Sequence, residues 1–182
     1  MIKPIYLYGQ EVLRDVAQDA DINSKEEIAA LVADLKETLE KSEGCGLAAP
    51  QIGVSKRVVI VTGEGMEEHY PYLAGFKRTL INPVVVEESK EQCTFNEGCL
   101  SVPFVYADVT RPATIKVRYY NEALEEVEEV FEKFACRMVQ HELDHLDGIL
   151  FVDKVAPIRK KIIAKKLVNI SRGKVKTGYK TK

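Results

Sequence analysis

The segment at residues 140–151, QHELDHLDGILF, constrains this chain more than any other stretch. It contains His141, Glu142 and His145 in a His-Glu-x-x-His run. On a helix, side chains four residues apart lie on one face, so the two imidazoles can bind a single metal ion. The glutamate between them is then placed to transfer protons. A catalytic site of this type needs a third protein ligand, and the origin of that ligand decides which kind of enzyme this is.

The chain downstream of the second histidine offers no well-spaced third ligand. In one zinc-protease pattern the next ligand falls at the position of Phe151, which cannot bind a metal. Asp147 is two residues from His145 and lies off the helix face. Asp153 remains an alternative, although it matches neither known protease spacing. We therefore expect the third ligand upstream, on a segment that folds back toward this helix.

Composition indicates one globular domain, expected over residues 1–170. Of the 182 residues, 46% are hydrophobic and 30% are charged, as in an ordinary soluble protein. The N-terminus lacks the apolar run of a secretory signal, and no stretch has the roughly 18 apolar residues of a membrane span. The four cysteines are scattered, which favours a reducing cytoplasm over a disulfide framework. We expect no membrane association and a monomer.

Charge is distributed unevenly along the chain. Residues 154–182 hold eleven of the 26 Lys and Arg and none of the Asp and Glu. Such asymmetry indicates a polyanionic partner for this end. Residues 157–170 have apolar side chains near helical spacing, and we expect Ile158, Ile162, Ile163, Leu167 and Ile170 to dock on the domain. Residues 171–182 are expected to form a flexible basic tail.

The order of secondary-structure patterns predicts an α+β fold. A helix is expected at about 21–44, with Ser24 and Glu27 forming a capping box. Strand patterns occupy the middle of the chain, at 57–61, at 79–88 with an interruption at Asn82-Pro83, and as a hairpin over 113–132. Helical spacing returns from about Phe131 to His145, and a C-terminal helix follows. We therefore expect mixed or antiparallel β-sheets packed around a central metal-binding helix.

Five residues upstream of His141, besides the carboxylates, are candidates for the third ligand. His69 lies in a glycine-rich segment and is expected to be an exposed loop histidine. Cys93 and Cys136 lie in strand-like and helix-like patterns and are expected to be small buried side chains. Cys45 and Cys99 are each flanked by glycine, in GCGLAAPQ and EGCLS. Glycine beside a residue indicates a turn or the close approach of another backbone, so both stretches are typical of a binding site.

Three motifs in this order resemble those of peptide deformylases: GCGLAAPQ, EGCLS and QHELDH. The segments YGQEVLRDVA and RTLINPVV are also similar to that family, so the resemblance covers roughly residues 1–155. It implies that Cys99, His141 and His145 are the metal ligands. It further implies one divalent ion, with iron(II) as the native metal and zinc as a substitute. His₂Cys donors suit both metals.

The resemblance also implies a reaction and the residues that carry it. A metal-activated hydroxide attacks the formyl carbon of a formyl-methionyl chain, and formate is released. Glu142 is the expected general base and acid. The side-chain amide of Gln51 and the backbone N–H of Leu100 are the expected donors to the oxyanion. The expected partners are nascent formyl-methionyl polypeptides and, through the basic C-terminal segment, the ribosome.

The peptide is expected to lie extended in a groove beside the metal. Its backbone would pair with Cys45-Gly46 and with Gly98, as an added strand. Phe134 and Met138, together with Leu100, are candidates for the wall of the methionine pocket.

Two charged side chains near the metal loop are expected to pair. Glu97 and Arg111 would form an ion pair behind the metal ligands. The sequence departs from the family pattern at Tyr106, where many members carry an arginine near the substrate, so the rim of the groove is expected to differ here. Two other functions are compatible with the same helix and fold. One is a metallopeptidase with Asp153 or another acidic residue as a ligand, and the other is a non-catalytic protein that binds peptide N-termini.

Overall fold

The computed structural model describes all 182 residues, and its architecture is α+β. Five strands form an antiparallel sheet in the order β1-β2-β3-β6-β7, and β4 pairs with β5 in a separate two-stranded sheet. The strands are β1 (Gly46–Ala48), β2 (Val58–Thr62), β3 (Lys77–Glu88), β4 (Gln92–Cys99), β5 (Val102–Pro112), β6 (Thr114–Tyr120) and β7 (Glu126–Glu132). The helices are α1 (Lys25–Ser42), α2 (Lys133–Leu146) and α3 (Pro157–Ser171). The predicted fold class is confirmed.

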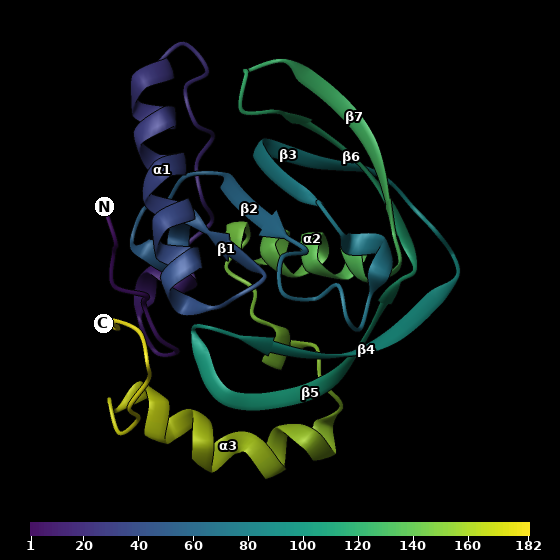
Figure 1. Ribbon diagram of the computed structural model, residues 1–182. Coiled ribbons are helices and arrows are strands. Elements are labelled where there is room, and N and C mark those ends of the chain that lie inside the picture. The colour runs from purple at the N-terminus through teal and green to yellow at the C-terminus, as the bar shows by residue number, and fades with distance from the viewer.

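Helix α2 lies at the centre of the molecule, between the large sheet and the β4–β5 pair (Figure 1). Its apolar face packs against the inner face of the sheet, in a core that includes Val59, Leu80, Val139 and Leu143. Ten of its fourteen residues are buried. A helix buried on nearly all sides holds its side chains in fixed positions, which is what a metal site requires.

Two further cores flank this centre. Helix α1 covers the other face of the sheet, with Leu35 and Leu39 against Ile60 and Ile81. Helix α3 packs against β5, with Ile163 and Ile170 in a core of their own. The three cores make a layered domain whose middle layer is α2 (Figure 1).

The interruption predicted in the second strand is present. Asn82 has a left-handed φ of 50°, and the pairing of β3 with β6 shifts register between Ile81 and Val84. The Asn82 side chain accepts from the Ala20 N–H and donates to the Ala20 carbonyl. The break in the strand therefore fastens the segment before α1 to the sheet.

Three local predictions were wrong. Ser24 makes no side-chain cap on α1, because its hydroxyl donates to Asp21 instead. Phe131 belongs to strand β7, which ends at Glu132, and α2 begins only at Lys133. On α3, only Ile163 and Ile170 are buried and Leu167 is partly buried, whereas Ile158 and Ile162 are exposed.

The C-terminal end also differs from the flexible tail that was predicted for residues 171–182. Thr181 forms a parallel β-bridge with Ile5, and Tyr179 packs against the α1 core. Both chain termini accordingly lie on the same side of the molecule (Figure 1). The sequence pattern missed this because lysines flank the few side chains that make the contacts.

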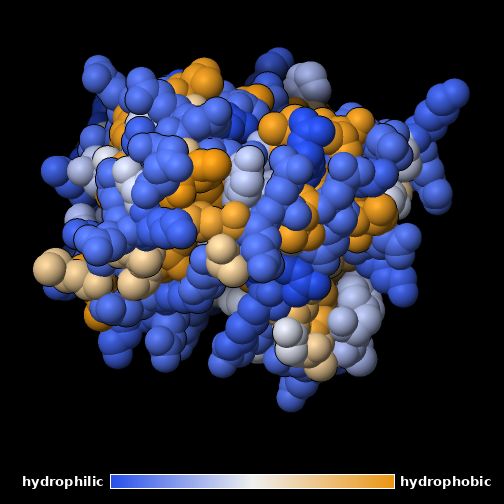
Figure 2. Space-filling model, turned by 90° about the horizontal axis from the view of Figure 1, so that it is seen from above, coloured by the Kyte–Doolittle hydropathy of each residue, from blue (hydrophilic) through white to orange (hydrophobic).

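The surface is largely hydrophilic, with apolar atoms exposed in small patches between charged side chains on the face seen in Figure 2. No helix is long and apolar enough to cross a membrane.

Candidate metal centre

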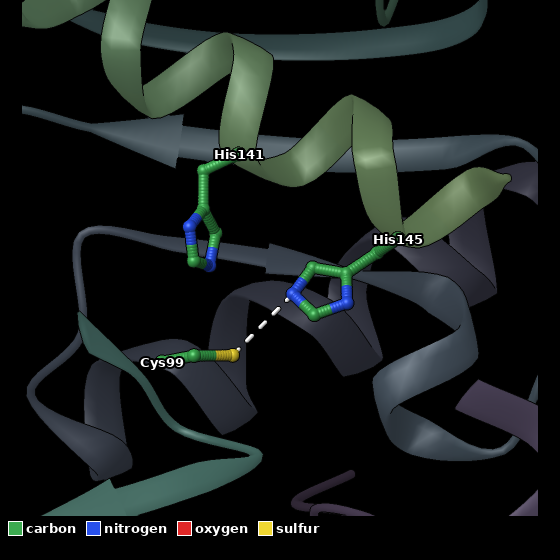
Figure 3. Close-up of side chains that lie close together, drawn as sticks. All are labelled: Cys99, His141 and His145. Atoms are coloured by element: carbon green, nitrogen blue, oxygen red, sulfur yellow. Dashed lines mark hydrogen bonds between the residues drawn. The ribbon is translucent and has the colours of Figure 1, made fainter. Parts of the chain in front are cut away.

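Cys99, His141 and His145 converge on one point at the centre of the fold. Figure 3 shows the two imidazoles projecting from α2 toward the thiol at the end of β4. One ligand atom from each residue lies within 4.8 Å of the others, and Cys99 Sγ is 3.4 Å from His145 Nε2. Two nitrogens and one sulfur arranged in this way fit zinc or iron(II). Of the upstream candidates, Cys99 is the one that lies beside the two histidines.

The turn that carries Cys99 is held by close strand pairing. Gly98 is opposite Tyr106, and the pairing then shifts register so that Cys99 is opposite Val102. A Cβ atom at Gly98 would lie 2.6 Å from the Tyr106 ring, so only glycine lets the ring cover the backbone there. This local packing turns the thiol toward α2.

Glu97 lies directly behind the histidines and is almost fully buried. Its carboxylate is 2.8 Å from His141 Nδ1, which leaves Nε2 free to face a metal. It also accepts two hydrogen bonds from Arg111, at 2.8 and 2.9 Å, which confirms the predicted ion pair. Burial alone would raise the pKa of Glu97, but the hydrogen bonds from His141 and Arg111 lower that pKa to about 2.

Two further charged residues that the sequence analysis missed complete this network. Arg137, which is 2% exposed, donates to Glu97 at 3.0 Å and to the carbonyls of Val109 and Cys93. Asp144 accepts from Arg111 at 2.6 Å. The sequence did contain one signal, because Arg137 interrupts the apolar pattern of α2. A guanidinium group is rarely buried without a partner, so this arginine predicts a buried acidic residue close to it.

Burial shifts the protonation of two groups on α2. It lowers the pKa of His145 well below its usual value, which favours the neutral imidazole that a metal binds. Burial also raises the pKa of Glu142 to about 7, and nearby Glu97 adds to this effect. One Glu142 carboxylate oxygen is buried without a partner. A Cβ atom at Gly46 would lie 2.9 Å from the Glu142 carboxyl carbon, so a glycine is needed beside it.

The Gln51 side chain is fixed in orientation next to the thiol. Its Oε1 accepts from the Ala48 N–H at 2.8 Å. Its Nε2 donates to Ser101 Oγ at 3.1 Å and lies 3.5 Å from Cys99 Sγ. The amide N–H group therefore points into the metal centre, where it can donate to a developing negative charge.

A cavity of about 1220 Å³ opens over the metal centre and contains nearly all of the residues singled out from the sequence. Phe134 lines this cavity and stacks on Tyr70, with ring centroids 4.5 Å apart. The predicted residues that line the cavity are Cys45, Gly46, Gln51, Glu97, Gly98, Cys99, Leu100, Phe134, Met138, His141 and Glu142. Tyr106 also lines it, at the exposed rim.

The other candidate ligands lie outside this centre. His69 is exposed on a loop, and Cys136 is buried in the core. Cys93 is half-buried beside Arg137. Asp153 pairs with Arg14 at 2.6 Å and is not part of the cluster of ligand atoms.

A central helix with this donor set, a buried glutamate and a cavity over both define the class of metal-dependent hydrolases with a His-Glu-x-x-His helix. Comparison with known proteins identifies the family. Residues 2–161 match the family model described as polypeptide deformylase. The chain belongs to this family, whose members are metal-dependent, and it is a hydrolase that removes the formyl group from formyl-methionyl peptides.

Relatives cover essentially the whole chain. A peptide deformylase of Fusobacterium nucleatum is 44% identical over 94% of both chains, and one of Cytophaga hutchinsonii is 40% identical over 100% of this chain and 97% of its own. Among solved structures, a Plasmodium falciparum peptide deformylase superposes with a TM-score of 0.83 at 29% identity, covering 93% of this chain and 95% of its own. A class I type b peptide deformylase of Acinetobacter baumannii with bound Met-Ala-Ser has a TM-score of 0.77 at 35% identity, covering 85% of this chain and 99% of its own.

Proposed function

We propose that Cys99, His141 and His145 hold one divalent metal ion, with iron(II) as the native ion and zinc as a substitute. The His₂Cys donor set and the hydrogen bond that occupies His141 Nδ1 support this assignment. When bound, the ion supplies a Lewis acid that makes water nucleophilic near neutral pH. Metal analysis of protein purified without oxygen tests the choice: zinc in place of iron, with activity unchanged by air, would contradict it.

Glu142 is the general base and acid of the reaction. It takes the proton from the attacking water and delivers it to the amine that leaves as the formyl C–N bond breaks. The support is its position: the carboxylate is buried beside His141 in the cavity, with one oxygen unpartnered.

The two oxyanion donors are Gln51 and Leu100. The Gln51 Nε2 group lies 3.5 Å from the thiol, and the Leu100 N–H follows Cys99 directly in the chain. Their closeness to Cys99 supports a role in donating hydrogen bonds to the formyl oxygen when the formyl carbon is at the metal centre.

The substrate is a formyl-methionyl chain that lies extended between Cys45-Gly46 and Gly98. The cavity provides the space, and the Met-Ala-Ser peptide bound to the A. baumannii relative supports occupancy by a methionyl peptide. Phe134 and Met138 form the wall of the methionine pocket.

The observation that carries these assignments is the convergence of the ligand cluster, Glu142 and Gln51 in one cavity. The test is formate release from a formyl-Met peptide by the parent and by Glu142→Ala. The variant is expected to keep its metal and lose about 10²–10⁴-fold in turnover. A metal-loaded variant that runs at the parent rate would exclude Glu142. A parent that binds the peptide but releases no formate would show a binding protein instead.

The basic C-terminal segment is proposed to dock on ribosomal RNA, which places the enzyme, as a monomer, beside nascent chains in the cytoplasm. Lys160, Lys161, Lys165 and Lys166 are all exposed on α3. Cationic side chains bind RNA phosphate by releasing counterions, and this binding weakens steeply with salt. Changing these four lysines to glutamate should abolish co-sedimentation with ribosomes at low salt and leave turnover of a short peptide unchanged. Co-sedimentation that survives the change would refute the proposal.

A further inference from the structure

The last residues of the chain form a short strand against the N-terminal segment. The Ile5 N–H donates to the Lys180 carbonyl at 2.9 Å, and the Leu7 N–H donates to the Lys182 carbonyl at 3.0 Å. The Lys182 N–H donates to the Ile5 carbonyl at 2.9 Å. These contacts bring the two chain ends together (Figure 1), and they fix the backbone that precedes Lys180.

The other edge of the N-terminal segment is bonded to both proposed oxyanion elements. The Tyr6 N–H donates to the Gln51 carbonyl at 2.8 Å. The Tyr8 N–H donates to the Ser101 carbonyl, also at 2.8 Å. Residues 5–8 thus lie between the C-terminal strand and the two segments that carry the oxyanion donors.

Tyr179 makes a direct bond from the C-terminal segment to the metal loop. Its hydroxyl donates to the Leu100 carbonyl at 2.7 Å. The ring is half-buried against the α1 core, and Tyr179 lines the same cavity as the metal ligands. Tyr179 is therefore a wall of the active-site cavity, although it is 80 residues away from Cys99 in the sequence.

The turn that contains Leu100 is held from outside the β4–β5 ladder, by contacts that include the Gln51 amide on Ser101 Oγ and the packing of Leu100 against the α1 core. Leu100 lies between the end of β4 and the start of β5, where the ladder shifts register and regular pairing stops. Its carbonyl is held by Tyr179, and the next carbonyl, that of Ser101, is held by Tyr8. The Leu100 carbonyl and the Leu100 N–H lie in adjacent peptide planes that meet at the Leu100 Cα. A hydrogen bond to the carbonyl restrains the plane after Leu100, and the direction of the N–H then varies only through the φ and ψ angles of this one residue.

We propose that Tyr179 is a positioning residue for the deformylation reaction, which aims the Leu100 N–H at the formyl oxygen through its hydrogen bond to the Leu100 carbonyl. The proposal rests on the oxyanion role proposed above for Leu100. It makes the C-terminal segment part of the catalytic site, and it assigns a function to a tyrosine that stands in an otherwise basic end of the chain.

The test is Tyr179→Phe, with Tyr120→Phe as the matched control. Tyr120 packs against the same core as Tyr179 and lies outside the active-site cavity. Formate release is measured per mole of bound metal, with KM and melting temperature in parallel. A misdirected donor weakens the binding of the transition state and leaves substrate binding unchanged. In Tyr179→Phe, kcat should therefore fall about 3- to 10-fold, which is the scale of one hydrogen bond. KM and metal content should match those of the control.

Each other outcome overturns the inference. A kcat per metal equal to that of Tyr120→Phe shows that the hydroxyl has no part in catalysis. A fall that is accompanied by metal loss, or by a rise in KM alone, assigns Tyr179 to stability or to substrate binding. A chain that ends at Gly178 should lose at least as much kcat as Tyr179→Phe, and full activity in that chain would also refute the proposal. If the parent itself releases no formate, the proposed function fails instead, so the two failures are distinguishable.

Discussion

Replacing Glu97 with glutamine should weaken both the fold and the metal site. Glu97 accepts four hydrogen bonds: two from Arg111, one from Arg137 and one from His141. Glutamine is isosteric but neutral, and its amide N–H₂ would face a guanidinium donor. Arg111 would still pair with Asp144, whereas Arg137 forms its ion pair with Glu97 and would lose it.

The structure sets the size of the effect. The Glu97 and Arg111 side chains are 3% and 5% exposed, so solvent screens the pair weakly. Removing one partner of a buried ion pair costs roughly 3–5 kcal/mol of unfolding free energy. His141 would also lose the acceptor that orients it, and the loss of such a partner typically lowers metal affinity by about 10–100-fold.

Chemical denaturation and chelator competition measure the two effects separately. The matched control is Asp153→Asn, which removes the carboxylate of the Arg14 pair. That pair is 43% and 39% exposed, so its loss should cost only about 0–1 kcal/mol and leave metal affinity unchanged. A Glu97→Gln protein that is as stable as the control and binds metal as tightly as the parent would refute the reasoning. Metal loss from Asp153→Asn would restore Asp153 as a ligand.

Three further predictions concern other parts of the site and sheet. Cys99→Ala should cost most of the bound metal, since a two-histidine site is weak, and full occupancy by metal analysis would place the third ligand elsewhere. Tyr106→Arg should raise the rate on peptides with acidic residues after the formyl-methionine and leave neutral peptides alone, and unchanged rate ratios would remove Tyr106 from the rim. Burial raises the pKa of Glu129, but hydrogen bonds from Arg78 and Tyr119 outweigh it and lower that pKa below its usual value. The ionised Glu129 therefore stabilises the fold at pH values above its pKa in the unfolded chain, and this contribution is lost as the pH falls through its lower pKa in the folded protein. The difference in unfolding free energy between the parent and Glu129→Gln should accordingly narrow on acidification from pH about 6 to about 3.

Two of the three proposed metal ligands could be predicted from local geometry in the sequence. Helical spacing alone places His141 and His145 on one face. The third ligand required the family resemblance, because glycine flanks made Cys45 and Cys99 equally good candidates. The structure separates them: Cys99 joins the cluster of ligand atoms, whereas Cys45 lines the cavity outside it.

The network behind the ligands was harder to predict because its members come from distant segments. Arg137 and Asp144 are ordinary charged residues in the sequence, and only the packing of α2 against β4 and β5 brings them to Glu97 and Arg111. The β4–β5 pair itself was not predicted. Its clearest signal was the alternation of Val105, Ala107 and Val109, which are the buried side of β5.

The basic end of the chain contains two separate features, the exposed lysines of α3 and the segment with Tyr179. The exposed lysines of α3 face solvent, whereas Tyr179 and the residues after it turn back toward the N-terminal segment and the metal loop. A deletion after Ile170 removes both the solvent-facing charge that follows α3 and the Tyr179 hydroxyl. A loss of activity in such a chain therefore says nothing about ribosome binding, and a loss of ribosome binding says nothing about catalysis. Charge reversal on α3 and Tyr179→Phe change one feature at a time, because no hydrogen bond joins the four lysines to Tyr179 or Leu100.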